Sequence, residues 1–240
     1  MNRAEIAKEF YIEDHAVIYG LLVKYATQMC GDSGMDSSVK GTILYAKERG
    51  LRMAMRASAD GEELTPNNYI AYGEWVDSKK LGKAEIKSVT PEYRTNSLVC
   101  GWCDAWKKYD LMEYGKVYCT WIDKNLVKGF NPDNELEIDS ILSHGGPCCA
   151  FYWVGAKFND MEDLKKNREK KVALADRVLK DFLYHTGHLL SAMCRQYYVD
   201  LGLVKGEAIA RKALKEYCET FGSAKLEALV EEAKQDFLKV

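Results

Sequence analysis

Four short strand-like segments lie in the middle of the chain, too close together in sequence for crossover connections. They are residues 83–89, 93–100, 135–142 and 148–155, and each is rich in strand formers or alternates in polarity. The turn sequences "TPE" and "SHGGP" lie within the two pairs. Because parallel strands need a connection of about a dozen residues or more, this spacing predicts an antiparallel sheet. The expected fold class is α+β, an antiparallel sheet of about four strands packed with N-terminal and C-terminal helices.

Helical patterns flank and interrupt these strands. Apolar spacing predicts helices over residues 5–29 and 37–59, two helices over 101–110 and 113–129, and three helices from residue 161 onward. The stretch "SADGEELTPNN" is interpreted as turn residues that close the second helix. We expect a single α+β domain over residues 1–240, with a helical part (1–80), a strand-helix-helix-strand core (81–156) and a helical tail (157–240).

Composition excludes several classes of protein. The formal net charge of -2 comes from well-mixed acids and bases, so no basic face for nucleic acid is expected. The first residues are not typical of a signal peptide, and no apolar run reaches the roughly 20 residues that span a bilayer. Eight cysteines in such a chain predict reduced thiols in a cytoplasmic protein. We expect no cofactor and no membrane or nucleic-acid partner, and leave open whether the chain is a homo-oligomer.

A repeated pattern places a thiol and a carboxylate one helical turn apart. It occurs as "CGWCD" and "CTWID", where Cys100 pairs with Asp104 and Cys119 with Asp123. Because a carboxylate opposes a second negative charge, the acids are better suited to bind a cationic substrate or to move a proton than to create a thiolate. Cys100 also falls where a strand precedes a helix, and thiols at helix N-termini are acidified.

Two other interpretations of this region stay open. Trp102 and Trp121 can be core or pocket wall, with each cysteine a small buried hydrophobe beneath them. The spacing of Cys100 and Cys103 suits zinc, but a structural site needs a second such pair, and only Cys119 follows at a suitable distance. We expect no metal.

Histidine and arginine supply further candidates. His144 lies in the glycine turn "SHGGP", and His188 lies one helical turn from His185; a buried structural role is the alternative for each. Arg56 belongs to "ERGLRMAMR", whose arginines at helical spacing can hold a carboxylate or form a solvated or salt-bridged face. Glu74 in "YGEW" is a candidate partner for a basic group.

Three stretches, "CGWCDAW", "YGKVYCTWIDKNLVKGFNPD" and "HGGPCCAFYW", together resemble the L-2-amino-thiazoline-4-carboxylic acid hydrolase family. The pattern of that family runs Cys, aromatic, acid; then Cys and Asp one turn apart; then Gly-Phe-Asn-Pro; then a glycine turn followed by Cys-x-Phe. The matching positions are Cys100, Trp102, Asp104, Cys119, Asp123, residues 129–132, Gly145, Cys149 and Phe151. The stretches "ERGLRMAMRA", "YGEW" and "YHTGHLL" are also similar. This chain departs from the pattern at Cys103, where relatives often carry His.

The resemblance implies a hydrolase that opens a small cyclic amidine or isothiourea ring such as 2-amino-thiazoline-4-carboxylate. The ring carbon between sulfur and two nitrogens is electrophilic when the ring is protonated. We expect Asp104 or Asp123 to hold that cation and Cys100 to attack. The roles expected of the others are pocket lining for Cys119, Cys149, Trp102, Trp121 and Phe151, proton transfer for His144 or His188, and substrate binding for Arg56 and Glu74.

Two alternatives belong to other classes of function. The glycine turn with Cys-x-Phe is similar to ligand-binding domains of the 4-vinyl reductase type, which implies a non-catalytic module that holds a small ligand or cofactor. A redox-active thiol enzyme that uses Cys100 and Cys103 is the other.

Overall fold

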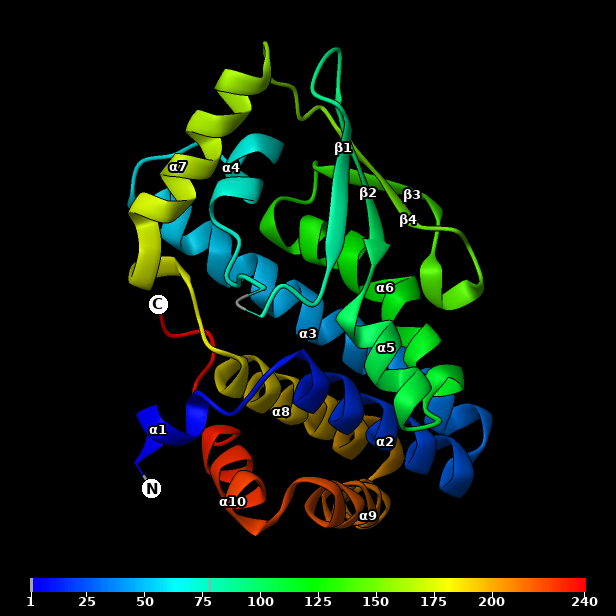
Figure 1. Ribbon diagram of the computed structural model, residues 1–240. Helices are drawn as coiled ribbons and strands as arrows, with labels where there is room; N and C mark the ends of the chain where they lie inside the picture. The colour runs from blue at the N-terminus through cyan, green and yellow to red at the C-terminus, as the bar shows by residue number, and fades with distance from the viewer. Residues whose placement is uncertain (1, 78) are drawn as a thin grey trace. The chain divides into compact units, whose positions relative to one another are not determined.

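The computed structural model describes residues 2–77 and 79–240, which form ten α-helices, one 3-10 helix and four strands (Figure 1). The chain order is α1 (Arg3–Ala7), α2 (Ile12–Cys30), α3 (Asp32–Ala59), α4 (Pro66–Ala71), β1 (Lys83–Ser88), β2 (Tyr93–Val99), α5 (Gly101–Lys108), α6 (Met112–Phe130), β3 (Glu135–Ser140), η1 (Leu142–His144), β4 (Cys149–Val154), α7 (Met161–Val178), α8 (Phe182–Leu201), α9 (Leu203–Phe221) and α10 (Ser223–Glu232). All neighbouring strands are antiparallel, so the predicted α+β class with a four-stranded antiparallel sheet is confirmed.

Contacts within the chain divide it into two compact units, each assembled from separate segments. Unit 1 comprises Met1–Tyr45, Gly101–Ile122 and Asp181–Asp236, and unit 2 comprises Ala46–Cys100, Asp123–Lys180 and Phe237–Val240. Both α3 and α6 contribute residues to each unit. The prediction that residues 1–240 form a single domain stays a prediction.

Unit 1 is helical and is built around α2. This helix is buried along most of its length, because its apolar residues are not confined to one stripe. It packs against α5, α8 and α9. At α5, the indole nitrogen of Trp106 donates to the carbonyl oxygen of Ala16 at 2.8 Å, and Gly20 lies against the side chain of Leu111. A helix with two or more buried faces is typical of the centre of a bundle.

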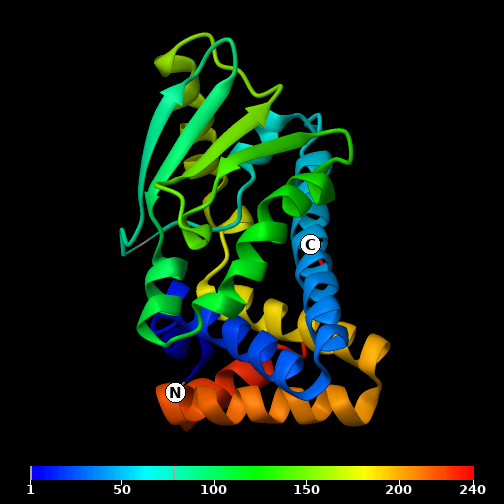
Figure 2. The same ribbon diagram turned by 90° about the vertical axis from the view of Figure 1, so that its right-hand side faces the viewer.

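Unit 2 contains the sheet, whose strand order is β1-β2-β4-β3 (Figure 2). Strand β4 pairs with both β2 and β3, and Cys149 lies opposite Ser97, Phe151 opposite Thr95 and Trp153 opposite Tyr93. Because directly opposed residues share a face and side chains alternate along a strand, Cys149, Phe151 and Trp153 all project from one face. That face carries the candidate site residues of β4.

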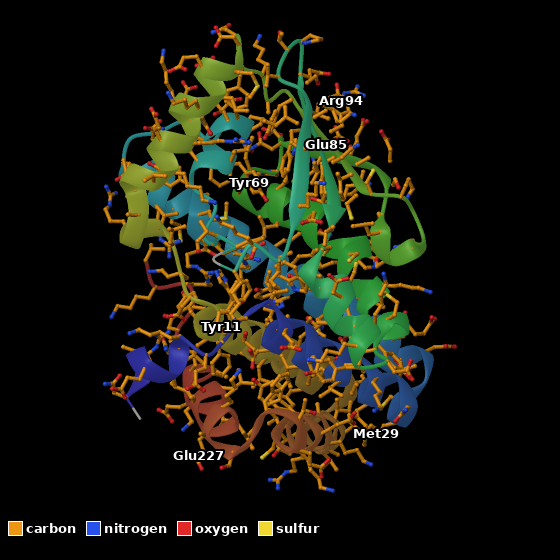
Figure 3. All side chains as sticks on the ribbon, viewed as in Figure 1. Tyr11, Met29, Tyr69, Glu85, Arg94 and Glu227 are labelled. Carbon is orange, nitrogen blue, oxygen red and sulfur yellow. The ribbon has the colours of Figure 1, made fainter. Side chains whose placement is uncertain are left out.

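Helices α4 and α7 pack together and cover part of this face (Figure 1). Tyr93 of β2 joins a buried apolar cluster with Phe158 and Leu164, and Ile70 of α4 and Trp153 pack against it. The opposite face is polar: the guanidinium of Arg94 lies 4.2 Å from the centre of the Tyr152 ring, and Glu85 lies on β1 (Figure 3). A sheet with one apolar and one polar face explains the alternating sequence of its strands.

Glycine allows α3 and α6 to cross with their backbones in contact inside unit 2. A methyl group added at Gly50 would lie 2.3 Å from the carbonyl oxygen of Leu126, and one added at Gly129 would lie 2.6 Å from that of Lys47. No larger residue fits either position without separating the helices. This crossing brings the part of α3 that carries the arginines close to the end of α6.

Three helical predictions need correction. The expected helix over residues 5–29 is two helices, because Tyr11 is extended and its backbone N–H donates to Asp14 at 3.0 Å. The stretch interpreted as turn ends in α4, which Thr65 caps and Pro66 begins. The tail has four helices in its described residues instead of three, because Leu179 is extended and Asp181 caps α8 through the N–H of Tyr184 at 2.8 Å.

No helix within residues 2–77 and 79–240 combines the length and the apolar character needed to cross a membrane.

Candidate functional site

The predicted site residues divide between the two units. Unit 2 contains Cys100, Asp123, His144, Cys149, Phe151, Arg56 and Glu74. Unit 1 contains Asp104, Cys119, Trp102, Trp121 and His188. Within unit 2, electrostatic interactions link the thiols of Cys100 and Cys149, the carboxyl group of Asp123 and Arg49 of the arginine cluster.

The two thiols of unit 2 come from the sheet and from the end of β2. Cys149 is 9 % exposed on β4, and its sulfur accepts the backbone N–H of Leu142 at 3.3 Å. Burial raises the pKa of this thiol to about 11, and the nearby groups of Cys100 and Asp123 add to the rise. Cys149 is therefore a neutral thiol at physiological pH. Cys100 is partly buried and lies directly between β2 and the first residue of α5, the position that the sequence predicted.

Asp123 lies on α6, one turn after Cys119. Partial burial raises the pKa of its carboxyl group to about 6, and the positive charge of Arg49 opposes that rise. The same carboxyl group raises the pKa values of Cys149 and of the Tyr69 hydroxyl. A carboxyl group that titrates near neutral pH can take up or release a proton during a reaction.

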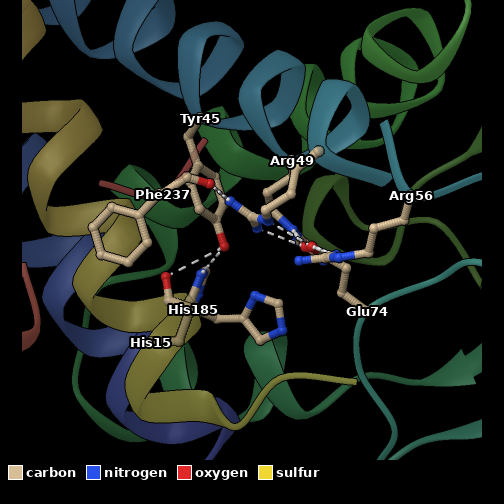
Figure 4. A network of polar contacts seen from close by, with 8 residues as sticks. His15, Tyr45, Arg49, Arg56, Glu74, His185 and Phe237 are labelled. Atoms are coloured by element: carbon tan, nitrogen blue, oxygen red, sulfur yellow. Dashed lines mark hydrogen bonds and ion pairs between the residues drawn. The ribbon is translucent and has the colours of Figure 1, made fainter. Parts of the chain in front are cut away.

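The arginines of "ERGLRMAMR" are salt-bridged and mostly buried, not solvated. Glu74 is fully buried, and the guanidinium groups of Arg49, Arg52 and Arg56 meet at its carboxylate (Figure 4). Arg52 donates to both carboxylate oxygens at 2.6 and 2.7 Å and to the carbonyl oxygen of Phe237 at 2.7 Å. Arg56 donates at 2.6 Å, whereas Arg49 lies 3.5 Å away. Burying four charged groups is favourable only when they are paired in this way.

Aromatic rings line the sheet face beside Cys149. Phe151 contacts Trp153 with ring centres 5.8 Å apart, and Trp153 contacts Tyr69 of α4 at 5.7 Å. The indole nitrogen of Trp153 donates to Thr95 on the neighbouring strand at 3.1 Å. The side chains of Phe151, Trp153, Tyr69 and Thr95 are only partly buried, whereas Tyr93 at the far end of the same face is buried. This face therefore combines apolar surface with hydroxyl groups.

His144 ends η1 and is exposed. Its Nδ1 lies 3.2 Å from the hydroxyl of the buried Ser143. Gly145 follows with a positive φ of 87°, the left-handed region that glycine adopts without strain, and this explains the glycine in the turn.

The candidates of unit 1 lie in different surroundings. Asp104 is exposed on α5, Cys119 is partly buried on α6 and Trp121 is 38 % exposed. His188 is fully buried in α8, and its ring lies 4.9 Å from that of Tyr45. The roles predicted for them stay predictions.

Trp102 takes part in a buried chain of hydrogen bonds within unit 1. Its indole nitrogen donates to Nδ1 of His15 at 3.1 Å. Nε2 of His15 lies 3.0 Å from the Tyr45 hydroxyl, which donates to the carbonyl oxygen of His185 at 3.4 Å (Figure 4). Because an indole N–H only donates, His15 must accept at Nδ1 and carry its proton on Nε2. His15, which is buried on α2, is therefore held by hydrogen bonds at both ring nitrogens.

Two residues of the unit 2 site were not singled out from sequence. Tyr69 lies on the short helix α4, in a region interpreted as turn and linker. Lys171 lies on α7, where burial lowers the pKa of its ammonium group to about 8 and Arg49 adds to the effect. Its Nζ donates to the carbonyl oxygen of Trp75 at 3.1 Å above Gly73. The lysine-rich sequence of α7 offers no signal that would distinguish Lys171 from its neighbours.

The described part of the chain contains no group of three or more His, Cys, Asp or Glu residues placed to hold a metal ion. The eight cysteines are present as thiols.

Comparison with known proteins gives one family. The model of the L-2-amino-thiazoline-4-carboxylic acid hydrolase family matches residues 11–153, which is more than half of the chain. No curated protein and no solved structure matches. The match includes α3, the sheet and both Cys-x-Trp-x-Asp stretches.

Proposed function

Because the chain belongs to the L-2-amino-thiazoline-4-carboxylic acid hydrolase family, we propose that it hydrolyses a small cyclic amidine or isothiourea ring. The first candidate substrate is 2-amino-thiazoline-4-carboxylate, a small molecule. The observation that carries the proposal is that Cys100 and Asp123, both in unit 2 with Cys149, each act electrostatically on the Cys149 thiol. A thiol at a helix start, a carboxyl group that titrates near pH 6 and a neutral thiol are suited to nucleophilic catalysis.

In the proposed first step the Cys100 thiolate attacks the ring carbon that lies between sulfur and the two nitrogens. The ionised carboxylate of Asp123 binds the protonated amidine and makes that carbon more electrophilic. The new carbon–sulfur bond forms, the bond from the same carbon to the ring sulfur breaks, and the leaving sulfur takes up a proton. The product stays bound to Cys100 as an isothiourea.

In the second step water adds to the same carbon and the bond to Cys100 breaks. The carbon keeps one oxygen and its two nitrogens, so the released molecule carries a carbamoyl group on nitrogen and a new thiol. One water is consumed for each ring opened, and no redox partner is needed. We propose that His144 carries the proton to the leaving sulfur, since it belongs to the same unit as Cys100, and that Cys149 and Phe151 line the site.

The alternative is a domain that binds a small apolar ligand without turnover. It is favoured by the partly buried aromatic row of Phe151, Trp153 and Tyr69, which would provide a pocket wall. A coloured ligand retained through purification, together with no hydrolysis of any cyclic amidine, would favour this alternative.

Replacement of the nucleophile tests the proposed reaction. Cys100→Ala should lower turnover of L-2-amino-thiazoline-4-carboxylate by about 1,000-fold or more, because the thiolate forms the covalent intermediate. Ring opening releases one thiol per turnover, which a chromogenic disulfide reagent measures in samples quenched and freed of protein.

Cys218→Ala is the matched control, because Cys218 lies on α9 of unit 1 and takes no part in the proposed chemistry. It should retain wild-type turnover. Full activity of Cys100→Ala would rule out this nucleophile, and an unchanged circular dichroism spectrum would show that a loss is not due to unfolding.

A further inference from the structure

Three arginines share Glu74, but they do not hold it equally. Arg52 is fully buried and directs three N–H groups to Glu74 and to Phe237 at 2.6 to 2.7 Å. Arg56 forms a short ion pair of 2.6 Å with Glu74. The ion pair of Arg49 is longer, at 3.5 Å. Of these three ion pairs with Glu74, that of Arg49 is therefore the longest.

Arg49 is also the arginine whose charge reaches the proposed reaction centre. It lowers the pKa of Asp123 and of Tyr69, and it contributes to the lowered pKa of Lys171. Arg49 is thus ion-paired with Glu74 and also acts electrostatically on the carboxyl group proposed to bind the amidine.

The helix crossing explains this position. Arg49 directly precedes Gly50, which contacts the backbone of α6 at Leu126 and Phe130. Asp123 lies on α6 about one turn before Leu126. Because the helices touch at backbone distance, side chains of these two residues can act on a common small molecule.

We propose that Arg49 is the residue that selects a substrate carboxylate, and that Glu74, Arg52 and Arg56 hold its side chain in place. This inference rests on the proposed function and deepens it, since it replaces Arg56 as the expected carboxylate ligand. A guanidinium group binds a carboxylate through two parallel N–H donors. With Arg49 on the carboxylate and Asp123 on the amidine, one zwitterionic ring is held at both ends.

The test compares two substrates that differ only in charge. They are L-2-amino-thiazoline-4-carboxylate and its uncharged 4-carboxamide. Arg49→Gln should lower kcat/KM for the carboxylate by about 100-fold and for the carboxamide by about threefold or less, because it removes a charge-assisted pair that only the carboxylate forms. Arg49→Lys keeps the charge but not the fork, so its loss for the carboxylate should be about tenfold.

Two further variants control for charge and for position. Arg94→Gln removes an arginine from the polar face of the sheet and should leave kcat/KM for both substrates within twofold. Arg56→Gln leaves Arg52 bonded to both oxygens of Glu74, so it should lower kcat/KM for the carboxylate by a smaller factor than Arg49→Gln does. A loss confined to the carboxylate in Arg56→Gln, with none in Arg49→Gln, would overturn the inference. If Arg49→Gln does not fold, as thermal melts would show, Arg49→Lys decides the outcome by the same comparison.

Calorimetric binding separates this inference from the proposed function. In a Cys100→Ala background, added Arg49→Gln should weaken binding of the carboxylate at least tenfold and leave that of the carboxamide unchanged. If the wild-type protein hydrolyses neither compound but this difference in binding is found, the hydrolase proposal fails and the role of Arg49 stands. Equal weakening for both compounds, or no binding of either, would overturn the role of Arg49.

Discussion

Asp123 illustrates how a single residue acquires its properties from its surroundings. The sequence places it one turn after Cys119 and suggests a carboxylate that binds a cation. Burial on α6 raises the pKa of its carboxyl group to about 6, which is well above that of an exposed carboxyl group. The groups that interact with it electrostatically include Arg49 from α3, Tyr69 from α4 and Cys149 from β4.

This raised pKa makes the stability of the protein depend on pH. Between about pH 4 and pH 6 the folded state binds more protons at Asp123 than the unfolded state, so this residue contributes stability that is lost as the pH rises through 6. Asp123→Asn should therefore match the wild type near pH 4 and exceed its free energy of unfolding by about 2 to 3 kcal/mol at pH 7. Urea denaturation at a series of pH values measures the difference.

The matched control is Asp133→Asn, because Asp133 is exposed in the same unit. It should change the free energy of unfolding by less than about 0.5 kcal/mol at each pH. A difference between Asp123→Asn and the wild type that stays constant from pH 4 to pH 7 would contradict the assignment.

At the scale of elements, α3 and α6 decide which residues meet in unit 2. Their amphipathic patterns predict two helices but not their crossing, since Gly50 and Gly129 read in sequence only as weak points of a helix. The structure explains why glycine occurs at both positions, because each of the two residues lies against the backbone of the other helix. The glycine pair therefore sets how closely α3 and α6 approach each other.

Gly50→Ala should disturb this crossing. The added methyl group would lie 2.3 Å from the Leu126 carbonyl oxygen, and neither backbone can move away alone. We expect a loss of about 1 to 3 kcal/mol in the free energy of unfolding, although alanine favours an isolated helix. Thermal and chemical denaturation measure it.

Ser58→Ala on the exposed surface of α3 is the comparison, and it should change stability by less than about 0.5 kcal/mol. If Gly50→Ala is as stable as the wild type, the close contact between the two helices is wrong.

At the scale of the whole molecule, the chain passes repeatedly between its two units. The boundaries fall after Tyr45, Cys100, Ile122, Lys180 and Asp236, and those in α3 and α6 lie inside a continuous helix. Each unit is therefore assembled from three separate segments of the chain, and neither is formed by one continuous stretch. A unit built from separate segments depends on the rest of the chain to close it.

We accordingly expect residues 1–240 to unfold in one cooperative transition, as the single-domain prediction requires. Differential scanning calorimetry should give a calorimetric enthalpy equal to the van't Hoff enthalpy. Near-UV circular dichroism and intrinsic tryptophan fluorescence should give the same midpoint. Two separated transitions would mean that the units unfold independently and that residues 1–240 are not a single domain.

The sequence alone determined the class of fold and the two pairs of strands. Apolar periodicity and turn residues are local signals, carried by neighbours in the chain, so the sheet and the helices over 37–59 and 113–129 were predictable. The local capping signals at Thr65 and Asp181 were also present, but they were interpreted as turn and as helix interior. The position of Cys100 directly before a helix was predictable as well, because the end of a strand and the start of a helix are also local signals.

Only the tertiary structure decided which candidates lie together. It places Glu74 against three arginines of α3, joins Cys149 electrostatically to Asp123, and locates Asp104, Cys119 and His188 in the other unit. These relations join residues far apart in the chain, and they follow from how helices cross and strands pair. Apolar periodicity shows which face of a helix or strand is buried, but it does not show which other element packs against that face.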